Sequence, residues 1–446
     1  MTLSAFLACV VCKATHSLLR LLNKGGTALP GKLALKICPD ILSILSKKVK
    51  TIAVTGTNGK TTSARMLENA LKKAGFAVFS NRSGANLISG IAAEFILNAN
   101  IFGRPKCEWA VIECDEAASR RVFAEIKPAA VLVTNLFRDQ LDRYGTVKTP
   151  RDSIADGIMK SPDTVLCLNA DCPMAASIGE RVPNRKLYFG LSSGRRSSPE
   201  SGESDICPMC GAKMRYAYVT YANLGAFSCR ACGFERKNTD VTVRELLDDG
   251  FILSEGNKTF LGSSALPGLY NVYNAAGAVT ALTAAGLDTE EALGSIADFD
   301  CGFGRMERFE IGENGARMIL IKNAAAADQT LGYIKSVRGP KSLAFVINSR
   351  IADGTDISWL DDADLGRISG MRELKNVYVC GERAEEIKNR LEKAGITCFM
   401  CTSYDKLISY MDMEKYEVFV MPTYTAMMEL RHLLVRHIGG REFWEQ

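Results

Sequence analysis

A short apolar run that leads into a glycine-rich turn is the feature of this sequence that most constrains its fold. Residues 51–54, Thr-Ile-Ala-Val, are followed by TGTNGKTT at 55–62, and the segment 61–76 has the pattern of an amphipathic helix. A strand that passes through such a turn into a helix leaves backbone N–H groups at the helix N-terminus, where the helix dipole favours an anion. The stretch therefore predicts a phosphate-binding loop between a buried strand and a helix.

The side chains of this turn are of the types that nucleotide binding requires. The candidate nucleotide-binding residues are Gly56, Thr57, Asn58, Gly59, Lys60, Thr61 and Thr62. We expect Lys60 to neutralise the terminal phosphate oxygens of ATP and the Thr61 hydroxyl to bind Mg²⁺. The complete phosphate-loop motif has a glycine where this chain has Val54, so the match depends on the strand before the turn and the helix after it. The alternative is a glycine turn with a solvated lysine.

A second apolar run ends in three carboxylates. The segment AVIECDEA, residues 110–117, supplies Glu113, Asp115 and Glu116 where the run stops. Mg²⁺ prefers oxygen ligands, so Glu113 is the candidate magnesium ligand and a candidate catalytic residue. Asp115 and Glu116 are equally consistent with an acidic helix start, in which the carboxylates cap the helix and are solvated.

Fifteen cysteines are present, and four of them form two CxxC pairs. The pairs are Cys207 with Cys210 and Cys229 with Cys232, a spacing typical of a four-thiolate zinc ribbon. Because four thiolates fill a tetrahedral site, we expect a structural zinc with no open position for catalysis. The remaining cysteines are scattered through apolar runs, which indicates a reducing, cytoplasmic location. Aromatic residues between the pairs fit packing around the metal better than a nucleic-acid surface, since the net charge is only +5.

The pattern along the chain predicts an α/β protein of more than one domain. We expect an N-terminal helical lead-in at 1–48, a parallel-sheet domain at 49–310 with the zinc insertion at 200–238, and a second α/β domain at 311–446. Apolar residues from Leu3 to Leu22 recur at helical spacing, which predicts a packed amphipathic helix ended by Gly25 and Gly26. A helix lying on a membrane surface is the alternative. Three basic or polar residues, Lys13, His16 and Arg20, interrupt any continuous membrane-length run.

The order of the motifs carries a resemblance to a known family. TGTNGKTT, ECDEA, TNLFRDQLDRYG, LNADCP, LPGLYNVYNAAGA and FGRMERF occur as in the Mur ligase superfamily of ATP-dependent amide-forming enzymes. Within it, the chain resembles the MurT family, the ligase-type subunits of lipid II isoglutaminyl synthases. The resemblance implies a central phosphate-loop ATPase domain with a zinc-ribbon insertion and a C-terminal Rossmann-like domain. It also implies that Asn271 and Asn274 face the nucleotide and that Arg305 reaches it from the hinge. Gln140 stands in DQLD, where amino-acid-adding relatives carry histidine.

The resemblance also implies a reaction and a partner. ATP would phosphorylate the α-carboxyl of D-glutamate in the lipid II stem peptide, and ammonia would convert the acyl phosphate to D-isoglutamine. Glutamine hydrolysis needs a cysteine with a histidine base, yet this chain has three histidines and no G-x-C-x-G elbow. We therefore expect a GatD-type amidotransferase partner in a heterodimer, contacted by the C-terminal domain. An aspartate of the loop IADGTDISW, Asp353 first and Asp356 second, would complete the partner's Cys-His pair. An ordinary Asp-Gly turn is the alternative.

Two other functions stay open beside the amidating ligase. One is an amino-acid-adding Mur or folylpolyglutamate-type ligase, and the other is a nucleotide-dependent nucleic-acid binder that uses the zinc ribbon. Gln140 and the zinc insertion count against the first, and the modest charge counts against the second. The segment KNAAAADQT, 322–330, departs from the proline- and glycine-containing loop that relatives carry near the nucleotide. We expect peripheral contact with the inner face of the membrane only through the lipid-linked substrate, and no binding of nucleic acid.

Overall fold

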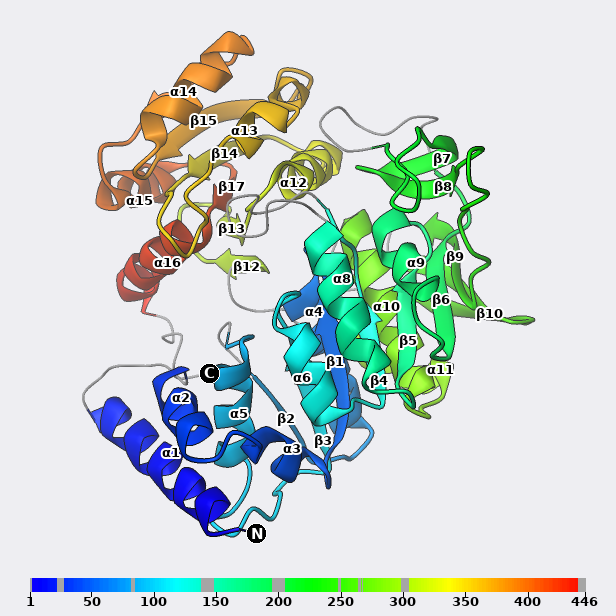
Figure 1. Cartoon of the computed structure of the whole chain (residues 1–446). Coiled ribbons are helices and arrows are strands. Elements are labelled where there is room, and N and C mark those ends of the chain that lie inside the picture. Colours follow the sequence, from blue (N-terminus) through cyan, green and yellow to red (C-terminus); the bar gives the residue numbers. More distant parts are fainter. Residues whose placement is uncertain are drawn as a thin grey trace. The chain divides into compact units, whose positions relative to one another are not determined.

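The computed structural model describes residues 2–21, 28–81, 85–137, 148–194, 205–247, 250–263, 266, 268–297 and 305–439. These residues form two compact α/β units, and the main division falls near residue 300 (Figure 1). Strand β12 (Arg305–Phe309) pairs with β13 (Ala316–Ile319) in the second unit. The division thus precedes β12, whereas the sequence analysis placed it at 310, and the N-terminal helices belong to the first unit.

The first unit is built on a nine-stranded sheet with the order β11-β10-β9-β6-β5-β4-β1-β3-β2. Its strands are β1 (Lys50–Thr55), β2 (Val78–Ser80), β3 (Trp109–Glu113), β4 (Ala130–Val133), β5 (Val165–Asn169), β6 (Lys186–Leu191), β9 (Val241–Leu247), β10 (Gly250–Glu255) and β11 (Lys258–Gly262). All neighbours from β2 to β9 are parallel, and β10 and β11 add antiparallel hairpins. Parallel strands put their carboxyl ends on one edge, and the phosphate loop follows β1 at that edge.

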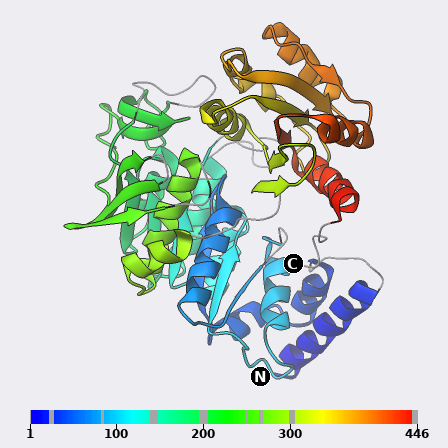
Figure 2. The same ribbon diagram turned by 180° about the vertical axis from the view of Figure 1, so that it is seen from behind.

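Helices cover both faces of this sheet. The described helices of this unit are α1 (Leu3–Leu21), α2 (Ala28–Ile37), α3 (Ile41–Ser46), α4 (Lys60–Lys73), α5 (Ile88–Leu97), α6 (Ser119–Ile126), α8 (Lys148–Met159), α9 (Pro173–Gly179), α10 (Leu269–Ala284) and α11 (Thr289–Ala297), of which α1 packs on α2 and α5. Helices α6, α8 and α9 lie on the face seen in Figure 1, and α4, α10 and α11 lie on the face seen in Figure 2. The small residues of α10, such as Gly277 and Ala278, let this buried helix approach the sheet closely.

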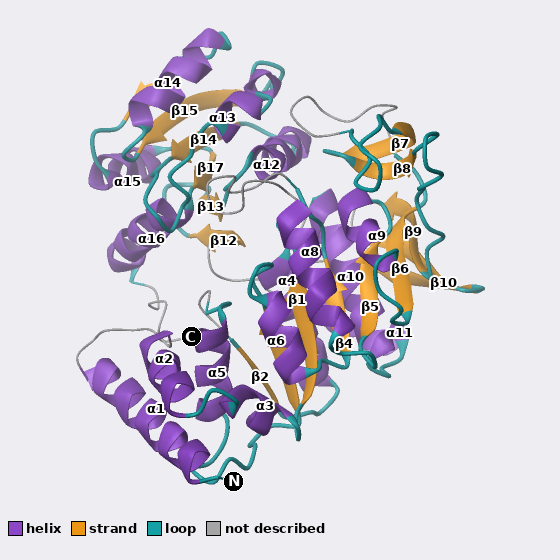
Figure 3. Cartoon of the chain, in the orientation of Figure 1, coloured by secondary structure: helices purple, strands orange, loops and turns teal. Residues whose placement is uncertain are grey.

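The second unit is a three-layer α/β sandwich. Its sheet has the order β12-β13-β17-β14-β15-β16, parallel except for β12, with β14 (Lys341–Val346), β15 (Leu374–Cys380), β16 (Phe399–Met400) and β17 (Glu417–Pro422). Its helices are α12 (Ala324–Ser336), α13 (Trp359–Asp362), α14 (Ala384–Lys393), α15 (Tyr404–Met413) and α16 (Tyr424–Ile438), with a short 3₁₀ turn at Leu365–Ile368. One core lies under α15 and α16 and a second under α12 and α14 (Figure 3). The predicted Rossmann-like α/β architecture is confirmed.

The segment predicted to bind zinc, called the zinc module below, contains a two-stranded hairpin, β7 (Arg215–Tyr221) with β8 (Leu224–Ser228), inserted between β6 and β9. The chain leaves the main sheet after Leu191 at the end of β6 and re-enters it at Val241 of β9, which pairs in parallel with Phe189 of β6.

Two local expectations were wrong. Helix α1 forms, but its buried side is Ala5, Ala8, Cys9 and Cys12, while the large aliphatic residues of the predicted packing stripe are exposed. Among the described helices, α1 alone is long and apolar enough to cross a membrane, although 22% of its apolar window is buried. The segment 324–327 is the first turn of α12 and not a loop, because Asn323 caps the helix and alanine favours it.

Candidate functional site

The turn after β1 adopts backbone angles that glycine alone reaches easily. Gly56 has φ 127° and Gly59 has φ 84°, and Gly59 is the N-cap from which α4 starts at Lys60. A Cβ on Gly56 would lie 2.4 Å from Thr134 Oγ1, so the backbone also passes too close to β4 for any other residue. The two glycines therefore shape a loop of N–H groups at the N-terminus of α4.

The loop is held in place from the end of β4. The Thr57 N–H donates to the Asn135 carbonyl oxygen at 2.8 Å, and the Asn58 N–H donates to Asn135 Oδ1 at 3.0 Å. The Thr134 hydroxyl donates to the Asn58 carbonyl at 2.6 Å. No function was predicted for Thr134 and Asn135 from the sequence, although their position directly after an apolar strand could have indicated one. They fix the loop before any nucleotide binds.

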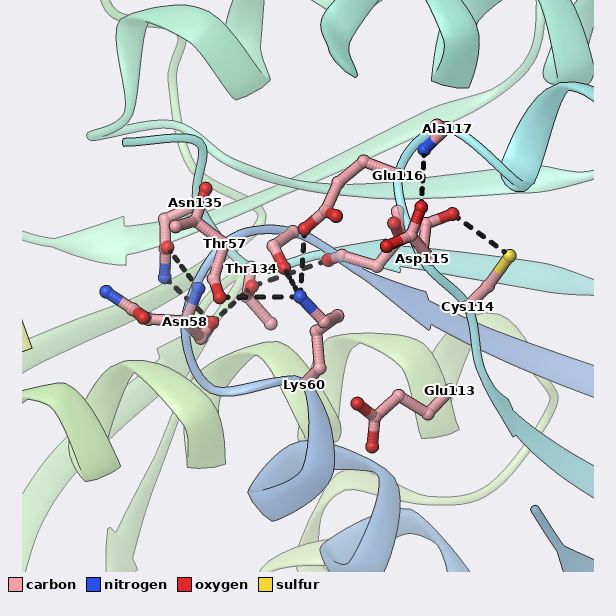
Figure 4. Close-up of polar contacts among 12 residues, drawn as sticks. Thr57, Asn58, Lys60, Glu113, Cys114, Asp115, Glu116, Ala117, Thr134 and Asn135 are labelled. Atoms are coloured by element: carbon pink, nitrogen blue, oxygen red, sulfur yellow. Dashed lines mark hydrogen bonds and ion pairs between the residues drawn. The ribbon is translucent and has the colours of Figure 1, made fainter. Parts of the chain in front are cut away.

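Lys60 lies inside the loop and is paired with a carboxylate. Its Nζ is 2.9 Å from Glu116 Oε1, and it also donates to the carbonyl oxygens of Gly56 and Thr57 (Figure 4). Asp115 Oδ1 accepts the Ala117 N–H at 3.0 Å, so this carboxylate caps the next turn. Asp115 therefore caps this turn, as the acidic-start interpretation predicted, but it is buried and not solvated, whereas Glu116 is an ion-pair partner of the phosphate-loop lysine.

Two possible metal ligands, Thr61 at the start of α4 and Glu113 at the end of β3, lie in contact. Thr61 Oγ1 donates to Glu113 Oε2 at 2.6 Å, and Glu113 is buried. Asn81 fixes the backbone at Glu113, because its Oδ1 accepts the Glu113 N–H at 2.8 Å and its Nδ2 donates to the Glu113 carbonyl at 2.7 Å. A hydroxyl and a carboxylate in contact beside a phosphate loop are hard ligands that fit Mg²⁺.

Helix α10 brings its two asparagines to the loop. Asn271 and Asn274 are buried, and Asn274 Nδ2 donates to Asn271 Oδ1 at 3.2 Å. A Cβ on Gly59 would lie 2.1 Å from Asn274 Oδ1, which places this amide against the loop backbone. The structure therefore brings together the phosphate loop, Glu113 and Asn274. Arg305 begins β12, and its side chain is outside the described residues, as is Gln140.

The four CxxC cysteines converge on one point. All four sulfurs lie within 4.8 Å of one another, with Cys207 Sγ 3.7 Å from Cys232 Sγ and Cys210 Sγ 3.5 Å from Cys229 Sγ. These distances are too long for disulfides, whose S–S bond is about 2.05 Å. They match the separation of about 3.8 Å that a tetrahedral ion with Zn–S bonds of about 2.3 Å imposes.

Each cysteine pair sits in a tight knuckle. Gly211 (φ 80°) donates its N–H to the Cys207 carbonyl, and Gly233 (φ 75°) donates to the Cys229 carbonyl, both at 2.9 Å. The backbone N–H of Cys232 contributes most to lowering the pKa of Cys229, to about 7. A thiol with a lowered pKa is readily converted to the thiolate that binds zinc. Phe227 and Phe234 pack against the cysteines, as the packing interpretation of the aromatics predicted.

A buried ion pair ties the zinc module to the first unit. Arg236 Nε lies 2.5 Å from Oδ1 of Asp171, which is fully buried after β5. The other oxygen, Asp171 Oδ2, accepts from the Tyr273 hydroxyl at 2.5 Å and from the Leu191 N–H at 2.8 Å. Tyr273 is on α10, beside Asn274. The module thus contacts the same helix that touches the phosphate loop.

The two aspartates of the loop after β14 have different surroundings. Asp353 is half-buried and accepts from the Thr425 N–H at 2.6 Å, the Thr425 hydroxyl at 2.5 Å and the Arg350 N–H at 3.0 Å. Asp356 is exposed and accepts from the Ser358 N–H at 2.8 Å. Asp353 therefore caps the first turn of α16, which is the capping alternative of the sequence analysis. The contact leaves one lone-pair site of its carboxylate unused.

Two family models match the chain. The Mur ligase middle domain covers residues 54–206, which includes the phosphate loop and Glu113. The MurT ligase C-terminal model covers residues 320–427, most of the second unit.

Curated relatives match over the whole length. The chain is 34% identical to the lipid II isoglutaminyl synthase (glutamine-hydrolyzing) subunit MurT of Streptococcus pneumoniae, over 99% of this chain and 100% of that protein. It is 31% identical to the subunit of the same name from Staphylococcus aureus, over 96% of this chain and 98% of that protein.

Solved structures share the fold at lower identity. A pseudomurein peptide ligase type C from Methanothermus fervidus has a TM-score of 0.69 at 21% identity, covering 89% of this chain and 80% of that one. MurF from Acinetobacter baumannii has a TM-score of 0.66 at 18% identity, covering 91% of this chain and 80% of that one. The expected Mur ligase-like fold is confirmed.

Proposed function

The chain belongs to the MurT family of the Mur ligases, and we propose on this basis that it is the ligase subunit of a lipid II isoglutaminyl synthase. It catalyses the ATP-dependent amidation of lipid II in peptidoglycan synthesis. The bond is formed at the α-carboxyl of D-glutamate in the stem peptide, which becomes D-isoglutamine. The observation that carries the proposal is the pairing of Lys60 with Glu116 and of Thr61 with Glu113 at the phosphate loop, in a chain similar to MurT over its full length.

The loop residues act on ATP by position and charge. The N–H groups of Gly59 and Lys60, at the N-terminus of α4, bind the β- and γ-phosphates, and Lys60 leaves Glu116 to neutralise the γ-phosphate as it moves to the substrate carboxylate. Thr61 and Glu113 would hold Mg²⁺, and the ion would supply charge compensation on the phosphate oxygens. Asn274 lines the loop from α10. Ammonia then attacks the carbonyl carbon of the resulting acyl phosphate, the bond from this carbon to the phosphate oxygen breaks and inorganic phosphate leaves. Loss of a proton from the nitrogen gives the amide.

Ammonia must come from a partner, since ammonia is mostly protonated at neutral pH. The S. pneumoniae relative is named as a subunit of a glutamine-hydrolyzing synthase. In this chain His16 lies on α1 and the other two histidines, His432 and His437, lie on α16. We propose a GatD-type amidotransferase as the partner, bound by the second unit. We also propose that the complex works in the cytoplasm, at the inner face of the membrane where it would meet its lipid-linked substrate.

Asp353 is the first candidate for orienting the partner's histidine. Its three hydrogen bonds fix the carboxylate and leave one acceptor site, which is what a triad acid requires. Asp356, bound only within its own turn, is the second candidate. Asp353→Asn and Asp356→Asn, compared for glutaminase activity of the complex and for free-ammonia amidation, would separate the two. If one of the two aspartates is the triad acid, its variant should lose glutaminase activity and keep amidation with free ammonia.

Zinc completes the proposed set of bound groups. The four thiolates have the spacing of a closed tetrahedral site, so the ion stabilises the module and takes no part in the reaction.

The test is amidation of lipid II by the purified chain with and without the amidotransferase. We expect glutamine-dependent amidation with both proteins, ammonia-dependent amidation with this chain alone, and loss of both in Lys60→Ala. Use of a free amino acid in place of ammonia would instead support the amino-acid-adding alternative. An assembled pair that hydrolyses glutamine but amidates nothing would contradict the proposal.

A further inference from the structure

We propose that the outward side of α1 is a docking surface for an anionic lipid bilayer. We define the α1 outer face as the exposed residues Leu3, Leu7, Val10, Ala14, Ser17, Leu18 and Leu21. Their spacing of three and four residues places them along one side of the helix. At about 1.5 Å per residue the face is about 28 Å long.

Helix α1 buries its small residues and exposes its large apolar residues, which is the reverse of an ordinary core helix. Its buried residues are small, namely Ala5, Ala8, Cys9 and Cys12, and they face α2 and α5. Its large aliphatic residues point away, with Leu3 at 74%, Leu18 at 57% and Leu21 at 82% exposure. A helix selected for folding alone buries its largest apolar side chains, because burial of a leucine stabilises by about 1.5–3 kcal/mol and burial of an alanine by less. The exposed leucines therefore indicate a second apolar contact.

The apolar surface continues beyond α1. Ile101 and Phe102, in the turn that follows α5, are 42% and 63% exposed. The Phe102 ring lies 6.1 Å from that of Phe6, which joins this turn to the outer side of α1. On α2, Leu29 is 51% exposed. Phe6 and Phe102 thus join apolar residues of two segments, and Leu29 adds an exposed one on the neighbouring helix α2.

The positive charge of residues 1–39 indicates which kind of partner the α1 outer face contacts. Residues 1–39 contain five lysines and arginines (Lys13, Arg20, Lys24, Lys32 and Lys36) and no aspartate or glutamate. This local excess equals the net charge of +5 of the entire chain. Arg20, Lys32 and Lys36 are exposed beside the apolar residues. Aliphatic residues flanked by basic ones are the pattern of a helix that lies in the interface of a membrane with anionic headgroups.

The same features disfavour other arrangements of α1. The packing of its small face on α2 and α5 is incompatible with a helix that spans the bilayer alone. Two copies of the chain that met through this face would bring their acid-free, basic segments together, which costs electrostatic free energy. A membrane contact satisfies both the apolar and the basic residues.

The functional consequence rests on the proposed function. A ligase whose substrate carries a lipid anchor meets that substrate only at the membrane surface. Docking through α1 would hold the first unit, with the phosphate loop, at that surface. The encounter with lipid II then becomes a search in two dimensions, which raises the effective concentration of the substrate.

The experiment is sedimentation of the full chain with vesicles that contain no lipid II, in the absence of ATP. Phosphatidylcholine vesicles are compared with vesicles of about one-third phosphatidylglycerol. We expect binding to the anionic vesicles only, weakened by salt and lowered about ten-fold or more in Leu18→Gln/Leu21→Gln. Lys32→Glu/Lys36→Glu should have a similar effect. The matched control, Leu246→Gln/Leu261→Gln, alters leucines that are 46% and 76% exposed on the β9–β11 hairpins and should bind like the unaltered chain.

Each contrary result would overturn the proposal. Absence of binding, equal binding to both vesicle types, or an equal loss in the control variant would do so. So would a dimer that Leu18→Gln/Leu21→Gln converts to a monomer without any binding to vesicles, since the face would then belong to a second copy. Amidation of detergent-dispersed lipid II is measured separately. If it occurs without vesicle binding, only the docking proposal fails, and if vesicles bind without amidation, only the proposed function fails.

Discussion

At the scale of single residues, the phosphate loop depends on one cation and two glycines. Lys60 has only 12% of its side chain exposed and contacts Glu116 and two loop carbonyls. It is therefore pre-positioned at the place where a γ-phosphate would lie. The energetic value of such a cation comes from the charge that it meets in the transition state.

Lys60→Ala should lower ATP-dependent amidation by about 10²–10³-fold or more, because the γ-phosphate loses its neutralising charge. Lys72→Ala is the control, since Lys72 lies on the same helix but pairs with Glu68 at 2.6 Å and is 45% exposed. Initial rates of amide formation and thermal unfolding are the measurements. Similar losses of activity in both variants would contradict a specific role for Lys60.

Gly59→Ala should reduce nucleotide affinity about ten-fold or more, because the new Cβ would lie 2.1 Å from Asn274 Oδ1 in addition to straining a backbone at φ +84°. Gly75→Ala has nearly the same φ, +85°, with no atom within 4 Å. Its cost should be the backbone strain alone, about 1–2 kcal/mol of unfolding free energy, with unchanged nucleotide binding. Isothermal titration with a non-hydrolysable ATP analogue and urea unfolding distinguish the two effects.

At the scale of elements, the zinc module and α10 form a connected unit. Asp171 receives Arg236 from the module and Tyr273 from α10, and it has no exposure to solvent. A buried carboxylate that loses its cation is left uncompensated, which costs more than the pair contributes. This arrangement makes the attachment of the module sensitive to one residue.

Arg236→Ala should lower the unfolding free energy by about 3–5 kcal/mol. Lys237→Ala, one residue away, breaks a pair with Glu180 in which both side chains are more than one-third exposed, and it should cost about 1 kcal/mol or less. Urea unfolding of both variants is the measurement. Equal losses would mean that the Asp171 contact does not anchor the module.

Removal of the metal is a second test of how the zinc module contributes to stability. A chelator should release about one zinc per chain, measured with a colorimetric indicator, and should lower the melting temperature because the module is too small to fold on its own core. Cys210→Ser should lower zinc content and melting temperature in the same way, while the rest of the protein stays folded. Full stability of a metal-free chain would contradict the structural role.

At the scale of the whole molecule, one buried and two half-buried tyrosines make stability depend on pH. Burial raises the pKa of Tyr188 and of Tyr218 to about 12, and burial together with Asp171 raises the pKa of Tyr273 well above its usual range. An unfolded tyrosine has a pKa of about 10. A group with a raised folded pKa contributes stability fully below its unfolded value and loses it as pH rises toward the folded one.

The unfolding free energy should therefore fall as pH rises from about 10 to about 12. Urea midpoints at several alkaline pH values give the slope. Tyr218→Phe should flatten part of it, because its hydroxyl, which donates to the Leu191 carbonyl at 2.5 Å, is then absent. A midpoint that stays constant through this range would refute the assignment.

The local part of the site was accessible from the sequence because strand, loop and helix are contiguous. The order β1, phosphate loop, α4 follows from an apolar run, two glycines and an amphipathic segment within about thirty residues, and each step is dictated by local backbone chemistry. The cysteine knuckles are similar, since each CxxC turn is a local structure. Thr61 and Glu113 were each predicted as magnesium ligands from their residue types and positions, and the structure shows that their side chains are in direct contact.

What only the tertiary structure decided are the contacts between distant segments. Asn135 contacts the phosphate loop, Glu116 contacts Lys60, and Asn274 lies against Gly59. Each of these contacts joins separate elements, and periodicity does not determine which polar groups meet. The same holds for the face of α1. Spacing alone shows that Leu3, Leu7 and Leu18 share one side of a helix, but whether that side is buried depends on α2 and α5. These helices cover the small residues instead, because small side chains allow closer helix packing.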